Sequence, residues 1–418
     1  MTNTTREAPA RQLTISSEAE LVAAMAAAAD GEGPVHAVGS GGSKSPCFDT
    51  QGTALRFARY DQVVAIDGPH VTIQAGATIA QLNAALAAHG LALPTNGEWG
   101  GATVAGSMAS GTHGGSARHG ILSSSALGLR LVTVGGGVLD LRRNDPGESF
   151  DHAVVSLGLL GVISTITFGC EEAFHVELAM RAVPFSWYAT HHATEHRDHE
   201  FHAAVWIPGV NAVITFTADR VPTPAHLRRR RERYSPATFL LHRLSRDFGI
   251  RSFPHAWFTA TTADRWDRVL TPIRTGATQV PVFKALSADW CESEMAVPIA
   301  RAGEALEALA GLIRRYPRVL TNPVGLRPTA ADTASLSPCY GRATWWFALF
   351  YRRHAAFERE LGALFERLDA RAHWGKHVAL RAEHLRAQYP RWEAFRRMRA
   401  ALDPRGVMAN DFSRRYGL

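Results

Sequence analysis

The sequence predicts an α+β protein built in two parts, and three observations support this prediction. Short apolar segments alternate with capped helical segments from residue 12 to residue 172. From about residue 173, loop glycines become fewer, aromatic residues and arginines become more frequent, and longer segments alternate with proline-containing loops. The 418 residues are enough for two domains, and 46% hydrophobic with 20% charged residues is typical of a globular chain.

The first predicted helix lies in the alanine-rich segment AELVAAMAAAADG, residues 19–31. Ser17 and Glu20 form a capping-box pattern in front of it, and Asp30-Gly31 follows it as a stop signal. These bounds argue against a secretory signal peptide. Because no apolar run is long enough to span a membrane either, we expect a cytoplasmic protein without a membrane partner.

Strands and a second helix follow in the first part of the chain. The pattern Thr78-x-x-Gln81 predicts a helix that ends at Gly90. Apolar and β-branched runs predict strands at 35–38, within 55–66, at 71–75, within 127–141 (two strands joined by a glycine turn) and at 161–170.

Cysteine spacing and charge exclude several classes of protein. Cys47, Cys170, Cys291 and Cys339 are scattered without CxxC spacing, which favours reduced thiols over a disulfide framework or a zinc site. The net charge of +7 is spread over most of the chain, and its one dense run is LRRRRER at 227–233. Without interleaved aromatic residues or a recognisable binding module, this run predicts a solvated segment and no nucleic-acid partner.

A glycine-rich loop, HAVGSGGSKSPCFDT, occupies residues 36–50. Glycines let backbone N–H groups approach a phosphate closely. The loop is not a Walker A motif, because Ser43 stands where a glycine must precede Lys44-Ser45, and it is not a dinucleotide fingerprint counted from Gly39, which would need glycine at position 44. A phosphate-binding loop and a flexible solvent loop both remain open on this segment alone.

A second glycine-rich segment, 90–125, decides between these readings. With the first loop it resembles the FAD-binding domain of the vanillyl-alcohol-oxidase (PCMH-type) flavoprotein superfamily, and within it the aldonolactone and alditol oxidases. The motifs that carry the resemblance are, in order, Val104-Ala105-Gly106-Ser107, Gly111-Thr112-His113-Gly114, His119-Gly120-Ile121-Leu122-Ser123, SLGLLGVIST at 156–165, Ser293-Glu294 ahead of Pro298, His373-Trp374-Gly375-Lys376 and the ending ALDPRGVMANDF.

The resemblance implies FAD as the cofactor and a particular division of the chain. A PCMH-type FAD-binding domain of two subdomains is expected over residues 1–172, and an α+β cap domain that binds substrate over 173–376. A C-terminal segment, 377–418, is expected to return to the FAD-binding domain.

The resemblance also implies which residues contact FAD, and small residues suit this task because their backbone donors reach phosphates and the flat flavin ring. Gly97 matches a site where oxidases often carry glycine, which is thought to leave oxygen a path to the flavin. The full implied set is Gly39, Ser40, Gly41, Gly42, Ser43, Gly97, Ser107, Gly111, Thr112, His113, Gly120, Ile121, Ser123, Val162, Ile163 and Lys376.

One residue of the family pattern is missing from the first loop. Many relatives carry a histidine there, in a Gly-Ser-x-His-Ser pattern, that is bonded covalently to the flavin. Gly42 takes that position here, so FAD is expected to bind without a covalent link. Cys47 is offset from the histidine position and is expected to be a core or loop residue.

The resemblance assigns the chemistry to a few side chains. Oxidation of a hydroxyl-bearing carbon needs a group that takes the hydroxyl proton and positive charge beside the reduced flavin. Lys376 and Arg327 match the family's positive residues, and Glu294 is expected to bind substrate. Glu98 replaces a substrate-contacting serine, so it is expected to act as the base or to grip the substrate, with a solvent-exposed turn residue as the alternative.

The substrate pocket departs from the pattern of sugar oxidases. Gly325 stands two residues before Arg327, where such relatives carry glutamate, and Ala348 and Phe350 stand where a polyol oxidase has histidine and threonine. Apolar groups cannot satisfy several hydroxyls, and unpaired buried hydroxyls are costly. A substrate less polar than a simple polyol, such as a biosynthetic intermediate, is therefore expected.

The histidine-rich tract HHATEHRDHEFH at 191–202 predicts a solvated helix. His192 and His196, four residues apart, could share a metal ion, but no third ligand is evident, so no metal is expected.

The leading hypothesis is an FAD-dependent oxidase that converts CH–OH to a carbonyl, with O₂ as acceptor and hydrogen peroxide as product. One alternative is amine oxidation or oxidative cyclisation, with Glu98 gripping a cation. A second is a non-catalytic flavin-binding protein, which the presence of both Arg327 and Lys376 disfavours. The sequence leaves the substrate and the oligomeric state open.

Overall fold

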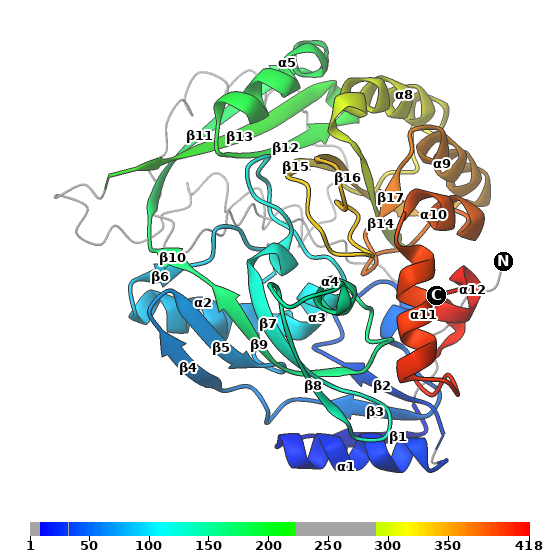
Figure 1. Ribbon diagram of the computed structural model, residues 1–418. Helices are drawn as coiled ribbons and strands as arrows, with labels where there is room; N and C mark the ends of the chain where they lie inside the picture. The colour runs from blue at the N-terminus through cyan, green and yellow to red at the C-terminus, as the bar shows by residue number, and fades with distance from the viewer. Residues whose placement is uncertain (1–8, 32, 98, 223–289) are drawn as a thin grey trace, which may run out of the picture.

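The computed structural model describes residues 9–31, 33–97, 99–222 and 290–418 (Figure 1). Glu98 and the basic run at 227–233 therefore lie outside the described residues. The described part combines four β-sheets with helices, which confirms the α+β class.

A small parallel sheet opens the chain, with strand order β1-β3-β2. Its strands are β1 (Arg11–Thr14), β3 (Thr53–Arg56) and β2 (Val35–Val38). Helix α1 (Glu18–Ala29) matches the predicted bounds, because the Ser17 hydroxyl accepts the N–H of Glu20 and caps the helix. Its buried side chains, Leu21, Met25 and Ala28, belong to the same core cluster as Val35 and Leu55 of this sheet.

A five-stranded antiparallel sheet follows, in the order β4-β5-β9-β7-β8. Its strands are β4 (Val63–Asp67), β5 (His70–Gln74), β9 (Val162–Gly169), β7 (Ala126–Val132) and β8 (Val138–Arg142). The remaining elements of this part are α2 (Ile79–Ala88), α3 (Val104–Ala109), α4 (Ser149–Ala153) and the strand pair β6 (Leu91–Ala92) and β10 (Glu171–Glu172). The predicted capping box of Thr78 and Gln81 begins α2.

The β-rich segment predicted within 55–66 is two strands in different sheets. Strand β3 ends at Arg56, and β4 begins at Val63. Between them the chain turns back, with the N–H of Tyr60 bonded to the carbonyl of Phe57 at 3.1 Å. Both aromatic side chains of this turn are buried, so the hydrophobic pattern continues through it although the strand does not.

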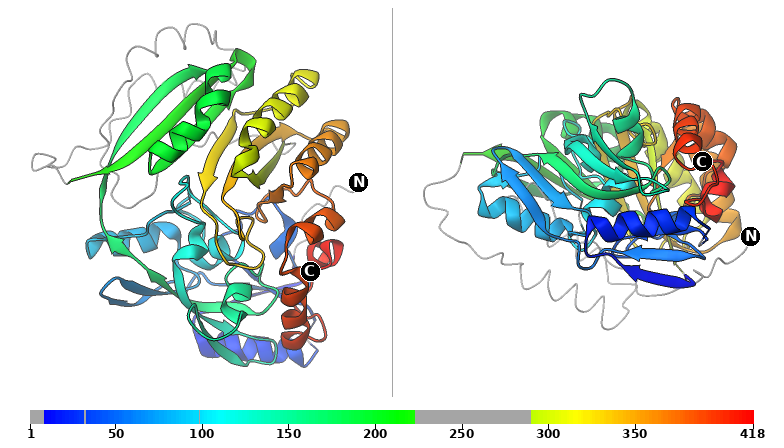
Figure 2. Two further views of the ribbon diagram at one scale, coloured as in Figure 1. Left: turned by 45° about the horizontal axis from the view of Figure 1, so that its top comes forward. Right: turned by 60° about the horizontal axis from the view of Figure 1, so that its bottom comes forward.

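A seven-stranded antiparallel sheet forms the second part, in the order β11-β13-β12-β15-β16-β14-β17. Its strands are β11 (His175–Pro184), β13 (Ala212–Val221), β12 (Phe201–Ile207), β15 (Val324–Thr329), β16 (Thr344–Arg352), β14 (Trp290–Pro298) and β17 (Arg371–Ala372). Helices α5 (Phe185–Asp198), α8 (Ala302–Arg315) and α9 (Ala355–Arg367) lie on its outer side, away from the first part of the chain (Figures 1 and 2).

Ring contacts show which face of this sheet the helices cover. Phe185 of α5 stacks on Trp206, and Phe365 of α9 contacts Phe347. Since side chains alternate along a strand, Trp346, Ala348 and Phe350 point to the opposite face. That inner face meets the loops of the first part.

The C-terminal helices are α10 (Ala382–Gln388), α11 (Trp392–Leu402) and α12 (Asp411–Tyr416). The N–H of Val35 bonds to the carbonyl of Val407 at 3.1 Å, and the side-chain amide of Asn410 donates to the carbonyls of Cys47 and Asp49 at 3.0 Å each. The end of the chain thus contacts its beginning, while the expected division of the chain, with boundaries at residues 172 and 376, stays a prediction. Cys47 is buried in the main hydrophobic core.

The histidine-rich tract forms α5, but the predicted solvation of its two central histidines is wrong. His192 and His196 face the sheet, with ring centroids 5.3 and 5.4 Å from that of Trp345. The two imidazole rings pack against the indole of Trp345. His191, the neighbour of His192 in the helix, lies on the exposed side. None of the helices within the described ranges is long and apolar enough to cross a membrane.

Candidate active site

A loop from the first part of the chain enters the seven-stranded sheet between β12 and β15. The N–H of Ser116 bonds to the carbonyl of Pro328 at 2.8 Å, and the N–H of His202 bonds to the carbonyl of Gly115 at 2.9 Å. A Cβ on Gly115 would lie 2.5 Å from the carbonyl oxygen of His202, so only glycine permits this approach. The loop thereby fixes His113 in front of the inner face.

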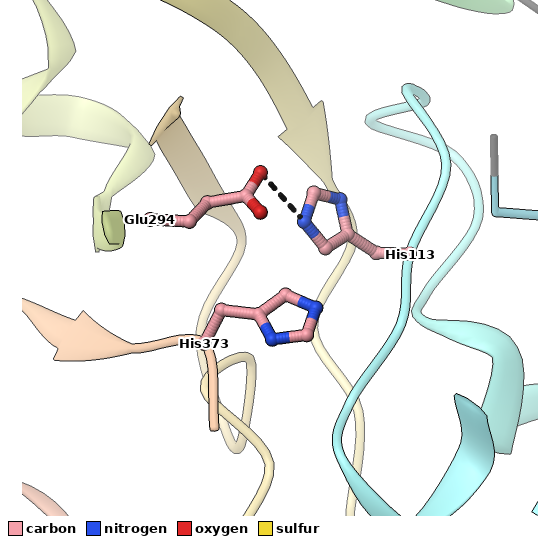
Figure 3. Close-up of side chains that lie close together, drawn as sticks. All are labelled: His113, Glu294 and His373. Carbon is pink, nitrogen blue, oxygen red and sulfur yellow. Dashed lines mark hydrogen bonds and ion pairs between the residues drawn. The ribbon is translucent and has the colours of Figure 1, made fainter. Parts of the chain in front are cut away.

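His113 is buried and held on three sides. Its Nδ1 lies 2.9 Å from the carbonyl oxygen of Gly114, and its Nε2 lies 3.2 Å from Oε1 of Glu294 (Figure 3). Its ring stacks on Trp346, with centroids 3.8 Å apart and an interplanar angle of 11°. The motif around His113 and the motif around Glu294, which are 181 residues apart, therefore meet directly.

Glu294 lies on the inner face of β14 with 6% of its surface exposed. Burial alone would raise the pKa of Glu294, but the charge of His113, its hydrogen bond and the charge of Arg327 hold that pKa well below its usual range. The carboxyl group is therefore ionised at neutral pH. The structure gives it His113 as a partner, and its expected role in substrate binding stays a prediction.

His373 completes the cluster from the loop after β17 (Figure 3). Its backbone N–H bonds to the carbonyl of Glu294 at 2.9 Å, and its Nδ1 accepts the N–H of Gly375 at 3.0 Å. Burial lowers the pKa of His373 to about 3, so the ring is neutral. Since Nδ1 is an acceptor, the proton of the neutral ring is on Nε2. His373 can donate a hydrogen bond from Nε2 but cannot accept a proton there.

Lys376 pairs with Glu292, a residue that the sequence analysis missed. The lysine Nζ contacts Oε1 of Glu292, and the carboxylate is buried on the inner face of β14. Glu292 and Glu294 are two residues apart on one strand and so share a face. This alternation next to the Ser-Glu motif was the signal that could have identified Glu292.

Gly325, Ala348 and Phe350, the three residues at which a departure from sugar oxidases is expected, lie together. Gly325 is in register with Ala348, and Ala348 is in register with Glu294, so the three form one row across β15, β16 and β14. A Cβ on Gly325 would lie 3.2 Å from the Cβ of Ala348. Phe350 lies in the next row of this face, in register with Glu292.

Arg327 lies in the same region as this row. It is on the inner face of β15, and a Cβ on Gly115 would lie 3.6 Å from its Cδ. Its charge acts on both Glu294 and His373. Arg327, His113, Glu294 and His373 therefore form one cluster, which we call the polar cluster.

An open cleft with a volume of about 60 Å³ lies on the first part of the chain. Three residues of the expected FAD set, Gly39, Val162 and Ile163, line it. Its other lining residues are mostly small: Ala37, Phe48, Phe57, Ala75, Thr103, Ala105, Gly106, Ala109, Gly158 and Gly161.

The residues present at the cleft fit a phosphate-bearing cofactor. A Cβ on Gly39 would lie 2.3 Å from Oγ1 of Thr103, and one on Gly161 would lie 2.6 Å from the carbonyl oxygen of Val132, so side chains at either position would collide with the wall. The hydroxyl of Ser107, next to Gly106 in the lining, is buried without a hydrogen-bond partner among the described residues. An unsatisfied buried hydroxyl beside a glycine-lined cleft suits a polar ligand.

The rest of the expected FAD set is divided among other places. Ser43 ties the first loop to the His373–Lys376 motif, because its hydroxyl donates to the carbonyl of Gly375 at 3.1 Å. Ser123 instead lines a separate small cavity of about 10 Å³ with Arg143 and Asp332. Ser40 and Gly41 are exposed in the loop, Gly42 and Gly120 are half-buried, Gly97 packs on Thr112 beside His113, and Gly111 and Ile121 are buried.

The polar cluster also has the composition of a metal site. Ligand atoms of His113, Glu294 and His373 lie within 4.8 Å of one another. The shortest of these contacts is a hydrogen bond, however, and Nδ1 of His373 already accepts one. The geometry is that of a hydrogen-bonded histidine and carboxylate beside a neutral donor.

Comparison with known protein families gives two matches. A model described as an FAD binding domain matches residues 9–142, and one described as D-arabinono-1,4-lactone oxidase matches residues 166–416. The second match covers more than half of the chain.

Curated relatives extend over nearly the whole sequence. An L-gulono-1,4-lactone dehydrogenase of Mycobacterium tuberculosis is 32% identical, over 98% of this chain and 96% of its own. An alditol oxidase of a Streptomyces species is 31% identical over 82% and 80%, and an L-gulonolactone oxidase of Bos taurus is 27% identical over 90% and 88%.

Solved structures of cholesterol oxidases share the fold. One described as solvent-stable superposes with a TM-score of 0.76 at 16% identity, covering 97% of this chain and 94% of its own. One from Brevibacterium sterolicum superposes with a TM-score of 0.73 at 14% identity, covering 97% and 93%. These identities establish the PCMH-type fold and no more. The family matches and the curated relatives show that the chain belongs to the aldonolactone oxidase branch of the PCMH-type FAD-dependent oxidoreductases, enzymes that act on CH–OH donors.

Proposed function

We propose that this enzyme oxidises a CH–OH group to a carbonyl at the inner face of the seven-stranded sheet. FAD, when bound, supplies the hydride acceptor. The observation that carries the proposal is the polar cluster, in which motifs from three distant parts of the chain meet beside Arg327. An anaerobic flavin-reduction assay with alcohols and lactones tests it.

Arg327 and Lys376 are the proposed positive groups, and His373 is a proposed hydrogen-bond donor to the substrate oxygen. The neutral ring of His373 presents a proton on Nε2, which suits a hydroxyl or developing carbonyl oxygen. Because that nitrogen already carries its proton, the base must be another group. Glu98 remains the proposed base on the strength of the resemblance.

We propose that the substrate is less polar than a simple polyol, and the register of the sheet supports this. The row of Gly325, Ala348 and Glu294 continues outward through Val205, Ile214 and Ala182. These last three side chains are half-buried and apolar. Apart from Glu294 at its inner end, the row offers no side-chain partner for a hydroxyl.

Oxygen is the proposed electron acceptor, with hydrogen peroxide as the product. The names of the bovine and Streptomyces relatives support an oxidase, whereas the mycobacterial relative is named a dehydrogenase. The resemblance places Gly97 where a glycine is expected to leave oxygen a path to the flavin. In the structure this residue packs on Thr112, and a Cβ at position 97 would lie 2.4 Å from the threonine methyl group. Oxygen consumption matched to peroxide formation during turnover tests this assignment.

Amine oxidation receives less support from the site. Gripping a cationic substrate needs a carboxylate without a basic partner. Within the described ranges of β14, Glu292 is paired with Lys376 and Glu294 with His113. The alternative therefore depends on Glu98 alone.

FAD is proposed to bind without a covalent link. Gly42 has no side chain that could form one, and the ring of Trp99 covers its α-carbon. A cytoplasmic location stays a prediction that rests on the scattered cysteines, all four of which are free thiols in the structure.

A further inference from the structure

Trp99 is a surface aromatic residue whose indole is held between two glycines. A Cβ on Gly42 would lie 1.9 Å from Cζ3 of the ring, and a Cβ on Gly101 would lie 3.0 Å from its Nε1. Neither glycine has a left-handed backbone, so their small size serves to make room for the ring and not to allow a turn. The indole nevertheless keeps 46% of its surface exposed.

The place of Trp99 beside the cleft follows from two segments that lie side by side. Gly39 of the first glycine-rich loop packs on Thr103, and both residues line the cleft. Three residues further along the loop, Gly42 packs on Trp99, which is four residues before Thr103. Trp99 therefore lies next to the cleft, on the side toward which the loop continues.

The same loop then reaches the turn that carries Lys376. The N–H of Lys44 bonds to the carbonyl of Gly375 at 2.7 Å, and the hydroxyl of Ser43 donates to the same carbonyl at 3.1 Å. Along the loop, Trp99 thus lies between the cleft, which fits a phosphate-bearing cofactor, and the lysine proposed to stand beside the flavin.

We propose that the indole of Trp99 packs against the flavin ring system of FAD and thereby helps to hold the cofactor. This contact depends on the proposed non-covalent binding, in which Gly42 supplies no bond to the flavin. An exposed indole suits a flat aromatic ligand, because stacking buries apolar surface on both partners. Stacking of a flat ring on an aromatic side chain strengthens binding by roughly 10-fold or more.

The first measurement is the release of FAD from the loaded protein. Holoenzyme is diluted in steps, and the fluorescence of free FAD gives the dissociation constant. Trp99→Leu should weaken FAD binding by about 10-fold or more, and Trp99→Phe, which keeps an aromatic ring, should weaken it less. Because Trp99 is exposed, neither change opens a cavity in the core, and thermal unfolding of each variant verifies its fold.

A second tryptophan provides the matched control. Trp187 lies on α5, on the outer side of the seven-stranded sheet, with its ring stacked on that of His191 at a centroid distance of 4.2 Å. Trp187→Leu removes an indole away from the cleft and should bind FAD as tightly as wild type.

The fluorescence of the bound flavin reports the contact itself. An indole that touches an oxidised flavin quenches its fluorescence by electron transfer. With protein in excess, so that all FAD is bound, the flavin should be brighter in Trp99→Leu than in wild type and unchanged in Trp187→Leu.

Unchanged FAD affinity in Trp99→Leu would overturn the proposed contact. Tighter binding would overturn it as well, because the ring would then obstruct the cofactor. Weaker binding with unchanged fluorescence of the bound flavin would show that Trp99 acts only on the loop. A coloured acid pellet would instead contradict non-covalent binding, and failure to oxidise any alcohol or lactone would contradict the proposed reaction. The fluorescence comparison stands in both cases.

Discussion

The indole ring of Trp99 lies directly over Gly42. A Cβ on Gly42 would lie 1.9 Å from Cζ3 and 2.6 Å from Cη2 of that ring. No side chain fits at position 42 while Trp99 keeps this place, although the ring is 46% exposed and has solvent into which it can move. Gly42, which is expected to take the place of the family's flavin-linking histidine, is therefore covered by an aromatic ring.

Acid should release the cofactor as free FAD. Binding would depend on backbone donors and on burial of the flavin ring, both of which are lost on denaturation. Precipitation with trichloroacetic acid should leave a yellow supernatant above a white pellet. A yellow pellet that is fluorescent on a denaturing gel would show a covalent link through another residue, and Cys47 and His113 would be the first to replace.

Lys376→Met should retain FAD and slow its reduction by about 10²-fold or more, because a positive charge beside the developing anion is lost. Glu292→Gln is the matched variant, because it leaves the lysine charge without its carboxylate partner. It should not slow reduction in the same way. Single-turnover absorbance traces measure both, and an unchanged rate for Lys376→Met would assign the lysine a purely structural role.

Simple polyols and sugar lactones should be poor substrates. The row through Gly325 and Ala348 provides no partners for several hydroxyls, and each unpaired hydroxyl costs about 1–3 kcal/mol. Two lactones with the same ring hydroxyl, one with a hydroxylated and one with an alkyl side chain, make the comparison direct. A kcat/KM of about 10⁴ M⁻¹s⁻¹ or more for xylitol, sorbitol or gulono-lactone would refute the apolar pocket.

Stability should fall as the pH falls below about 6.5, the ordinary histidine pKa. Burial lowers the pKa of His36 to about 4 and that of His202 to about 3. The unfolded chain therefore binds protons that the folded chain excludes, so the stabilisation is complete above about pH 6.5 and is lost toward the folded pKa values, at about 1.4 kcal/mol per unit of pKa shift.

The measurement is urea unfolding of His202→Gln and wild type between about pH 7.5 and 5, above the range of ordinary carboxylates. His202→Gln should flatten the pH dependence, whereas His191→Asn, on the exposed side of α5, should not. Burial raises the pKa of Asp332 to about 6, so protonation of Asp332 stabilises the folded state as the pH falls over part of this range. The free energy of unfolding of the variant is therefore compared with that of wild type at each pH. Parallel curves for the His202 variant and wild type would contradict the assignment.

Local signals in the sequence were sufficient for elements that end at caps and turns. The bounds of α1 follow from Ser17, and the turn between β7 and β8 follows from Gly135 and Gly136, whose φ angles of 90° and 82° favour glycine. Such signals act within a few residues of the chain. Local signals could not reveal that the chain turns at Tyr60 and passes from one sheet to another. Phe57 and Tyr60 are buried in this turn, so the sequence there shows the same hydrophobic pattern as a strand.

The candidate site depends on contacts between distant residues. Motif resemblance identified His113, Glu294 and Lys376 separately. The contacts of Glu294 with His113 and of Glu292 with Lys376, however, arise from the order of strands in the sheet. In the same way, the packing of His192 on Trp345 depends on which face of β16 the helix covers. The spacing of these residues along the chain does not predict the contacts within the site or the packing of His192 on Trp345.

Anaerobic reduction of the bound flavin is the most direct test of the proposal that this enzyme oxidises a CH–OH group. Purified protein loaded with FAD is mixed without oxygen with alcohols and lactones of increasing apolar character, and the absorbance near ~450 nm, typical of an oxidised flavin, is followed. We expect this band to be lost with at least one CH–OH compound. The loss should be fastest with a compound that has an apolar side chain, and Arg327→Met should slow it. As a control, dithionite should reduce the bound flavin fully. If the band then persists with every alcohol and lactone tested, the proposed oxidation of a CH–OH group is wrong.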